Sequence, residues 1–165
     1  MHKIIVNNAA MNFSAAHFIS FGGKCERLHG HNYAVSAEFE GRLSKDKYVF
    51  DFVEVKAIMK ELCNELDHRF LLPEKSDLIT SSLLENNEWE IRYQNRRYIF
   101  PAEDVLVLPV DNITAERIAE HMCGRLEQEL LKHTPDNIKS ICVGVEEAPG
   151  QTAYFTQKMP GYREN

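Results

Sequence analysis

The sequence predicts an α+β fold in which two helices pack on one face of an antiparallel sheet. Two runs of alternating apolar and polar residues lie near the N-terminus, two amphipathic helical patterns follow, and two further alternating runs close the chain. The resulting order is β-β-α, an irregular middle, and then α-β-β. The length of 165 residues favours a single domain spanning 1–165, with an insert at about 74–111.

The first predicted strand runs from about Lys3 to Phe18, and the second begins near His29. Between them, the two glycines of Phe21–Lys24 predict a loop. A short third strand, or the end of a strand, is expected at Tyr48–Phe52. Several apolar residues of the second strand share one face with its histidines: Tyr33, Val35, Ala37 and Phe39.

The first helix is predicted to begin after Asp51, which can cap it with Glu54 as the capping-box partner. Segment Leu66–Pro73 is expected to end this helix. The apolar stripe that would face the core consists of Val55, Ile58, Met59, Leu62 and Leu66.

The second helix is predicted to begin near Thr114 and to end before Pro135. Its apolar face consists of Ile118, Met122, Leu126 and Leu130. A strand with alternating Ile141, Val143 and Val145 follows, and a turn at Pro149–Gly150 leads into a returning strand, Gln151–Gln157.

The insert at about 74–111 has the weakest pattern of the chain. Trp89–Tyr93 and Arg97–Phe100 flank Gln94–Arg96, which predicts a hairpin. The apolar run Val105–Val110 predicts one more strand.

Three histidines are candidate metal ligands. His29 and His31 are two residues apart, so both imidazoles lie on the same face of a strand, and Gly30 between them lets the backbone approach closely. His17 ends the alternating run that begins at Phe13, and pairing of the two runs would bring three imidazoles together. Three neutral nitrogen ligands suit zinc and leave a fourth position open. The alternatives are unrelated histidines, or a closed structural site with Cys25 as the fourth ligand.

Composition excludes some functions. The net charge of −6 argues against nucleic acid or an anionic membrane surface as the main partner. The chain has no apolar run of membrane-spanning length and no signal-peptide pattern at its start, so we expect a cytoplasmic protein. The four cysteines show no CxxC pairing and are expected to be free thiols.

Four blocks of sequence resemble the 6-pyruvoyltetrahydropterin synthase and 6-carboxytetrahydropterin synthase family. The blocks are Phe13–His17, Cys25–Tyr33, Leu66–His68, and Thr114–Glu116 with the later Val145–Glu146 and Tyr154. The resemblance implies a tunnelling fold, in which a four-stranded antiparallel sheet carries two helices on its outer face. It also implies that three subunits join their sheets into a barrel, that two trimers form a homo-hexamer, and that active sites lie at subunit interfaces.

The resemblance also implies roles for particular residues. His17, His29 and His31 would bind zinc (Zn2+), and Cys25 would be the general base. Zinc, Lys24 and Arg27 are candidates for lowering the pKa of its thiol. Asp67 and His68 would form a second catalytic pair, in which the carboxylate holds one imidazole tautomer; as an isolated dipeptide they would more often be a cap or a surface pair.

Other residues would hold the substrate. Glu146 matches the glutamate that anchors the pterin ring, and its neighbour Glu147 is a rival because a slip of one residue reverses the face. Thr114 and Glu116 match a second pterin-side motif, although a helix cap explains them equally well. Lys24 and Arg27 are candidates for contacting the triphosphate.

The resemblance implies a zinc-dependent lyase that converts 7,8-dihydroneopterin triphosphate to 6-carboxy-5,6,7,8-tetrahydropterin, on the route to deazapurines such as queuosine. The alternatives are elimination to 6-pyruvoyltetrahydropterin and a retro-aldol step to 6-hydroxymethyldihydropterin, where some members use a glutamate near the cysteine position. Here Glu26 is next to Cys25, so the third branch stays open. A zinc- and pterin-binding protein without turnover is the hypothesis from another class. The insert at about 74–111 departs from the family pattern, and this departure bears on the identity of the substrate more than on the fold.

Overall fold

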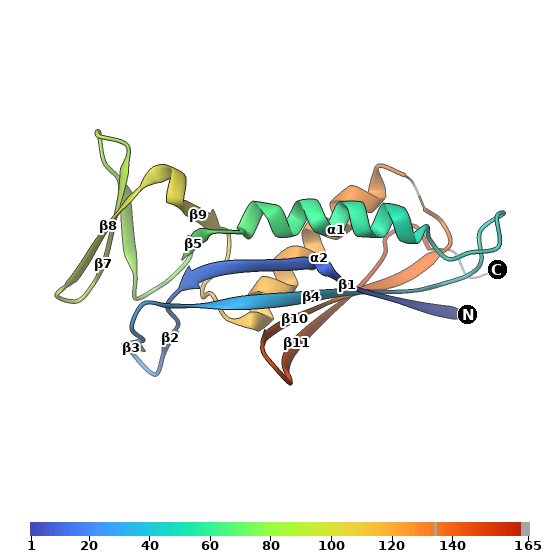
Figure 1. Ribbon diagram of the computed structural model, residues 1–165, viewed down its shortest axis with the longest axis horizontal. Helices are drawn as coiled ribbons and strands as arrows, with labels where there is room; N and C mark the ends of the chain where they lie inside the picture. The colour runs from blue at the N-terminus through green and yellow to red at the C-terminus, as the bar shows by residue number, and fades with distance from the viewer. Residues whose placement is uncertain (134, 163–165) are drawn as a thin grey trace.

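The computed structural model describes residues 1–133 and 135–162 and is built around one large sheet with two helices on one side (Figure 1). In chain order the elements are β1 (His2–His17), β2 (Ser20–Phe21), β3 (Lys24–Cys25), β4 (His29–Gly41), α1 (Phe52–Leu66), β5 (Arg69–Pro73), β6 (Thr80–Leu83), β7 (Glu88–Tyr93), β8 (Arg96–Pro101), a 3-10 turn (Ala102–Asp104), β9 (Val105–Leu108), α2 (Ala115–Leu131), β10 (Ile138–Ala148) and β11 (Gln151–Lys158).

The α+β prediction is confirmed, but the sheet is larger than the expected four antiparallel strands. The strand order is β11-β10-β4-β1-β5-β9. The first four strands in this order pair antiparallel, as expected. β5 then pairs parallel with β1, and β9 pairs parallel with β5, which makes six strands.

One local prediction was incomplete and another was wrong. Segment Leu66–Pro73 does more than end the helix, because Arg69–Pro73 forms strand β5. A short apolar run buried on both faces has no alternation that would distinguish it from the last turn of a helix. Tyr48–Phe52 is not a strand: residues 48–50 form a bend and Phe52 already begins α1, because the Asp51 carboxylate accepts the backbone N–H of Val53 and caps the helix there.

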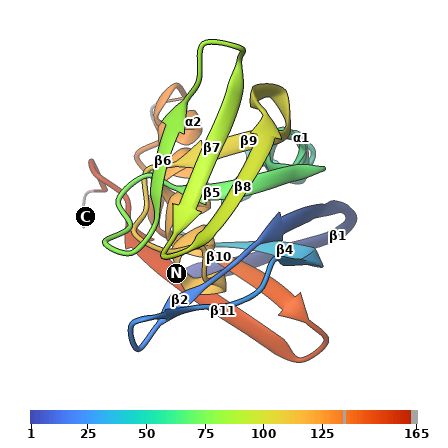
Figure 2. The same ribbon diagram turned by 90° about the vertical axis from the view of Figure 1, so that its left-hand side faces the viewer.

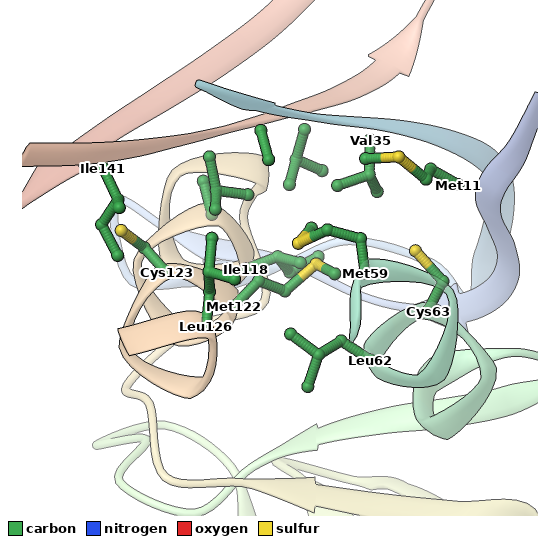
Figure 3. Close-up of a cluster of buried hydrophobic side chains, with 14 of the residues drawn as sticks. Met11, Val35, Met59, Leu62, Cys63, Ile118, Met122, Cys123, Leu126 and Ile141 are labelled. Atoms are coloured by element: carbon green, nitrogen blue, oxygen red, sulfur yellow. The ribbon is translucent and has the colours of Figure 1, made fainter. Parts of the chain in front are cut away.

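The main core lies between the sheet and the two helices. Figure 3 shows the apolar faces of α1 and α2 meeting side chains from β1, β4 and β10. All the residues of both predicted helical stripes are buried or packed against this core, including Met59 and Leu62 of α1 and Met122 and Leu126 of α2. Within the described residues, no helix is both long enough and apolar enough to cross a membrane.

Most of the insert forms a small sheet separate from the main one. The predicted hairpin is present as β7 and β8, and β6 adds a third antiparallel strand (Figure 2). The predicted strand at Val105 is β9, which joins the main sheet. A second apolar cluster fixes the insert to the rest of the chain, with Cys25 among its members; the others are Phe18, Phe70, Leu72, Ile79, Ile91, Tyr93 and Val105.

Candidate functional site

The pairing of β1 with β4 brings three histidines to one face of the sheet. His17 lies directly opposite His29, and Ala15 lies opposite His31. An irregularity in β1 between Asn7 and Asn12 shifts the register, so that the inward-facing residues have even numbers before it and odd numbers after it. His17 therefore faces the same side as the two histidines of β4, as the sequence predicted.

Gly30 is required for this pairing because the neighbouring strand lies against its α-carbon. A β-carbon at this position would lie 2.8 Å from the carbonyl oxygen of Ala15. This contact involves backbone, which cannot move aside as a flexible side chain can.

The three imidazoles form a compact cluster with one carboxylate. The ring centroid of His17 lies 4.6 Å from that of His29 and 5.2 Å from that of His31, and the centroids of His29 and His31 are 5.0 Å apart. Glu147 completes the cluster, in which the candidate ligand atoms of all four residues lie within 4.8 Å of one another. Among the residues that the structure describes, Cys25 does not belong to this group, so the fourth candidate ligand is a carboxylate and not the thiol.

Backbone carbonyls orient two of the rings. Nδ1 of His17 lies 2.8 Å from the carbonyl oxygen of Ile113, and Nδ1 of His29 lies 2.8 Å from that of Arg27. A carbonyl only accepts hydrogen bonds, so each Nδ1 carries the proton and each Nε2 keeps its lone pair. A carbonyl partner of this kind commonly fixes the tautomer of a metal-ligating histidine.

The protonation state of His17 is also the one that a metal ligand needs. Its side chain is completely buried, and this burial lowers its pKa to about 4, assisted by His29 and His31 and opposed by the hydrogen bond to Ile113. The imidazole is therefore neutral at pH 7, and the neutral form is the one that binds metal.

His31 has a buried nitrogen that lacks a partner. Its Nε2 lies 2.9 Å from Oε1 of Glu147, but this contact does not have hydrogen-bond geometry, and the atom has no partner within residues 1–133 and 135–162. A buried polar atom without a partner is costly, and a bound cation would remove that cost. Three imidazole nitrogens, with a carboxylate beside them, fit Zn2+.

Asn112 is part of this site, although the sequence analysis did not single it out. Its amide accepts the backbone N–H of Ser20 at 3.1 Å and donates to the carbonyl of Ser20 at 2.7 Å. These two bonds tie the segment before α2 to the chain just after His17, which places the Ile113 carbonyl at the ring. The only signal in the sequence is that Asn112 lies two residues before the predicted helix cap.

The structure separates the two candidate glutamates. Glu147 lies at an irregularity of β10, between Glu146 and Ala148, and points toward the histidines. Glu146 instead accepts the backbone N–H of Gly150 across the turn at 2.7 Å. An extra residue in a strand re-aims a side chain, and spacing along the sequence does not reveal such a change.

Cys25 is a member of the second apolar cluster and, among the described residues, not of the metal cluster. Its side chain is buried, which raises the pKa of the thiol, while Arg96 lowers it and Glu26 raises it. Lys24 and Arg27, the expected sources of positive charge, have exposed side chains. In the part of the chain that the structure describes, the cation that lowers the pKa of this thiol is Arg96, which belongs to the insert.

Asp67 and His68 follow α1 and are paired with each other. Oδ2 of Asp67 lies 2.8 Å from Nδ1 of His68, and the imidazole is 83% exposed. His68 shares an open hollow of about 610 Å³ with His31, and Phe100 and Asp104 of the insert segment form part of its wall. The second predicted pair and one of the metal-site histidines therefore face the same space.

Thr114 and Glu116 lie at the start of α2. The hydroxyl of Thr114 accepts the backbone N–H of Arg117 at 3.3 Å, so Thr114 is the helix cap. Glu116 is exposed in the first turn, where its charge complements the helix dipole. The capping role is thus present, and a role in substrate binding stays a prediction.

Comparisons with known proteins agree with this geometry. The sequence model of the family described as 6-pyruvoyl tetrahydropterin synthase matches residues 7–158. A protein of Methanocaldococcus jannaschii, named "Putative 6-carboxy-5,6,7,8-tetrahydropterin synthase", is 34% identical over 153 residues, covering 92% of this chain and 93% of that protein. A Pyrococcus horikoshii protein with the same name is 32% identical over 147 residues, covering 87% of this chain and 85% of that protein.

Solved structures of 6-pyruvoyltetrahydropterin synthase are also similar to this chain. The structure of Plasmodium vivax 6-pyruvoyltetrahydropterin synthase has a TM-score of 0.90 and 32% identity, covering 95% of this chain and 98% of that chain. A variant of the Plasmodium vivax protein, in which a catalytic glutamate is replaced by alanine, matches equally well.

Proposed function

This chain belongs to the 6-pyruvoyl tetrahydropterin synthase family of lyases, and we propose that it converts 7,8-dihydroneopterin triphosphate to 6-carboxy-5,6,7,8-tetrahydropterin with the help of zinc. The observation that carries the proposal is the cluster of His17, His29 and His31 with a buried, unpartnered Nε2 on His31 among the described residues. The two similar archaeal proteins have names that correspond to this product.

In this proposal the three histidines hold the ion. A zinc ion bound there would act as a Lewis acid that polarises the hydroxyl groups of the substrate's side chain. The carbonyls of Ile113 and Arg27 keep two of the rings in the tautomer that presents Nε2.

Two groups move protons. Cys25, as a thiolate, removes a proton from the substrate's side chain, and His68 returns protons. Nδ1 of His68 faces Oδ2 of Asp67 at 2.8 Å, so Nε2 of that ring is the atom left for proton transfer. Binding alone would need neither group.

The remaining proposed contacts position the substrate. A carboxylate accepts two parallel hydrogen bonds from the pterin's amino group and ring N–H. The sequence favours Glu146 for this role, whereas the orientation of Glu147 toward the histidines favours Glu147. Thr114 and Glu116 would contact the pterin side, and Lys24 and Arg27 the triphosphate.

The homo-hexamer of two trimers is also part of the proposal. The hollow that contains His68 is open in a single chain, which leaves room for a second chain to complete it. Ile5 and Tyr154 are more than half exposed on β1 and β11. Native mass spectrometry tests the assembly, and a monomer with full turnover would contradict it.

The deciding experiment is incubation of the zinc-loaded protein with 7,8-dihydroneopterin triphosphate, followed by mass spectrometry. Release of acetaldehyde supports the carboxy product, and a retained three-carbon side chain would identify the pyruvoyl branch instead. Cys25→Ala should lose turnover while keeping zinc and pterin binding. No turnover by the wild-type protein would favour a binding protein without catalysis.

The retro-aldol branch is the second candidate because of Glu26. Its carboxylate lies 3.8 Å from Nε2 of His29, and its side chain is 37% exposed. Glu26 therefore points toward the metal cluster. The similar Plasmodium vivax enzyme has a catalytic glutamate. If 6-hydroxymethyldihydropterin is the product, and Glu26→Gln abolishes it while Cys25→Ala does not, this branch replaces the first.

A further inference from the structure

The end of the β7–β8 hairpin contacts the loop that carries Cys25. Tyr93 and Arg96 are cross-strand partners on either side of the hairpin turn. The guanidinium of Arg96 donates to the carbonyl of Glu26 at 2.8 Å and to the carbonyl of Cys25 at 3.1 Å. The hydroxyl of Tyr93 donates to the carbonyl of Gly23 at 2.9 Å. Two insert residues therefore hold three carbonyls of a four-residue segment.

The other printed bonds hold the ends of this loop: Asn112 is bonded to Ser20, and the backbone N–H of Glu26 donates to the carbonyl of Ile19 at 2.9 Å. β2 and β3 are two residues each and form their own small sheet, joined by Gly22 and Gly23 with positive φ angles of 54° and 75°. A two-stranded ribbon of this length is not stable alone in water. Figure 1 shows β2, β3 and the insert strands at the same end of the molecule.

The contact is partly buried and has more than one component. Arg96 lies over the ring of Tyr93, with the guanidinium carbon 5.4 Å from the ring centroid. Tyr93 and Cys25 both belong to the second apolar cluster, so apolar side chains surround much of the thiol. In such surroundings a nearby positive charge acts more strongly than it would in bulk solvent.

We infer that Arg96 is a positioning residue for Cys25: its guanidinium fixes the backbone of the cysteine loop and supplies the positive charge beside the thiol. The inference rests on the proposed role of Cys25 as general base. It assigns a function to the insert, because Arg96 lies on β8 of the insert.

The pKa of the Cys25 thiol is raised overall by its burial, and Arg96 acts against that rise. Burial opposes thiolate formation, Arg96 favours it and Glu26 opposes it. Tyr93 is the titratable neighbour from the insert, and its hydroxyl is engaged by Gly23. A general base near neutral pH needs its pKa lowered, and within the described residues Arg96 is the cation that acts in that direction.

The test uses the zinc-loaded protein with substitutions at two neighbouring positions, Arg96 and Arg97. Arg96→Gln removes the charge and keeps a polar stem. Arg97→Gln is the matched control, because Arg97 is on the same strand, is 54% exposed and pairs with Glu90. Alkylation of Cys25 by iodoacetamide, followed by peptide mass spectrometry across pH, reports the thiol independently of turnover. The midpoint of each pH profile is compared, since the absolute rate also depends on exposure of the loop.

In Arg96→Gln we expect the midpoint to move to higher pH by up to about one unit, which is a tenfold loss of thiolate at a given pH. We expect kcat to fall by about the same tenfold factor with little change in KM, because Arg96 binds backbone and not substrate. Arg97→Gln should match the wild type. Arg96→Lys, which keeps the charge without the two-pronged donor, should restore the midpoint in part.

A folded Arg96→Gln protein whose profile coincides with those of the wild type and Arg97→Gln would overturn the inference. If Arg96→Gln does not fold, Arg96→Lys decides, since a wild-type profile together with a wild-type kcat would also overturn it. Failure of the proposed function is a separate outcome: the wild type would not turn over the pterin substrate, whereas the alkylation profiles would still report the effect of Arg96.

Discussion

Oδ2 of Asp67 lies 2.8 Å from Nδ1 of His68, while Oδ1 of the same carboxylate accepts the backbone N–H of Ser14 at 2.7 Å. The backbone N–H of His68 in turn donates to the carbonyl of Ser14. His68 has a φ of 57°, in the left-handed region that residues other than glycine seldom adopt. An exposed imidazole is thus held in one orientation by contacts between the end of α1 and strand β1.

This pairing predicts how stability depends on pH. The N–H of Ser14, and then His68, hold the pKa of Asp67 below its ordinary value of 3.8. A carboxyl with a depressed pKa in the folded state stabilises the fold above its unfolded pKa, and this contribution is lost as pH falls through the lower, folded value. We expect Asp67→Asn to be less stable than the wild type at pH 6, with a difference that shrinks below pH 3.8. Urea unfolding at several pH values measures it, and a difference that stays constant across the acid range would contradict it.

Gly30→Ala should disrupt the metal site. The new β-carbon would lie 2.8 Å from the Ala15 carbonyl, so β1 and β4 must move apart where His17 faces His29. We expect a cost of about 1–3 kcal/mol in the free energy of unfolding and weaker zinc binding, measured by competition with a chromophoric chelator. The control is Gly124→Ala, where nothing lies within 4 Å of the new carbon; there we expect unchanged zinc affinity and a gain of roughly 0.5–1 kcal/mol from better helix propensity.

Asn112→Ala should weaken zinc binding without touching the ion. The variant loses both hydrogen bonds to Ser20, so the Ile113 carbonyl no longer holds the His17 ring. Loss of such support typically costs about 10–100-fold in metal affinity. Asn86→Ala is a fitting control, since Asn86 is bonded to Glu88 within the insert. Equal affinities in the two variants would show that Asn112 does not position His17.

Replacing Glu146 and Glu147 by glutamine, one at a time, should have sharply different effects on pterin binding. Glu147→Gln removes a charge beside the three histidines, whereas Glu146→Gln affects a hydrogen bond to Gly150 in an exposed turn. We expect Glu147→Gln to weaken binding of a non-reactive pterin, measured by calorimetry on the zinc-loaded protein, and Glu146→Gln to have little effect. The reverse order would support Glu146, which the sequence favours.

Leu126→Ala tests the core between the helices and the sheet. Leu126 is completely buried in the cluster that Figure 3 shows, so the substitution leaves a cavity. We expect a loss of about 2–5 kcal/mol in the free energy of unfolding. Leu131→Ala on the same helix is the control, because Leu131 is 40% exposed and should change stability far less. Chemical denaturation measures both, and equal losses would contradict the packing.

Much of the fold could be predicted because it depends on local periodicity. The apolar residues of α1 from Val55 to Leu66 recur at helical spacing, and those of β1 and β4 alternate with polar residues. The cap at Asp51 also depends only on residues close to it in the sequence. β5 could not be predicted, because its pairing with β1 is parallel and joins segments more than fifty residues apart. Its short buried run has no pattern that distinguishes it from the end of a helix.

By itself, the sequence determined which faces are apolar and that His29 and His31 share one of them, because side-chain direction alternates in a strand. It predicted that His17 would join them if the two strands pair, and β1 does pair with β4. Only the tertiary structure decided that Glu147 joins these histidines, that Asn112 sets the position of the Ile113 carbonyl, and that Arg96 lies on the loop of Cys25. Each of these contacts depends on a bulge, a turn or the docking of the insert. Such features place distant residues in contact through the path of the whole chain, which no local spacing records.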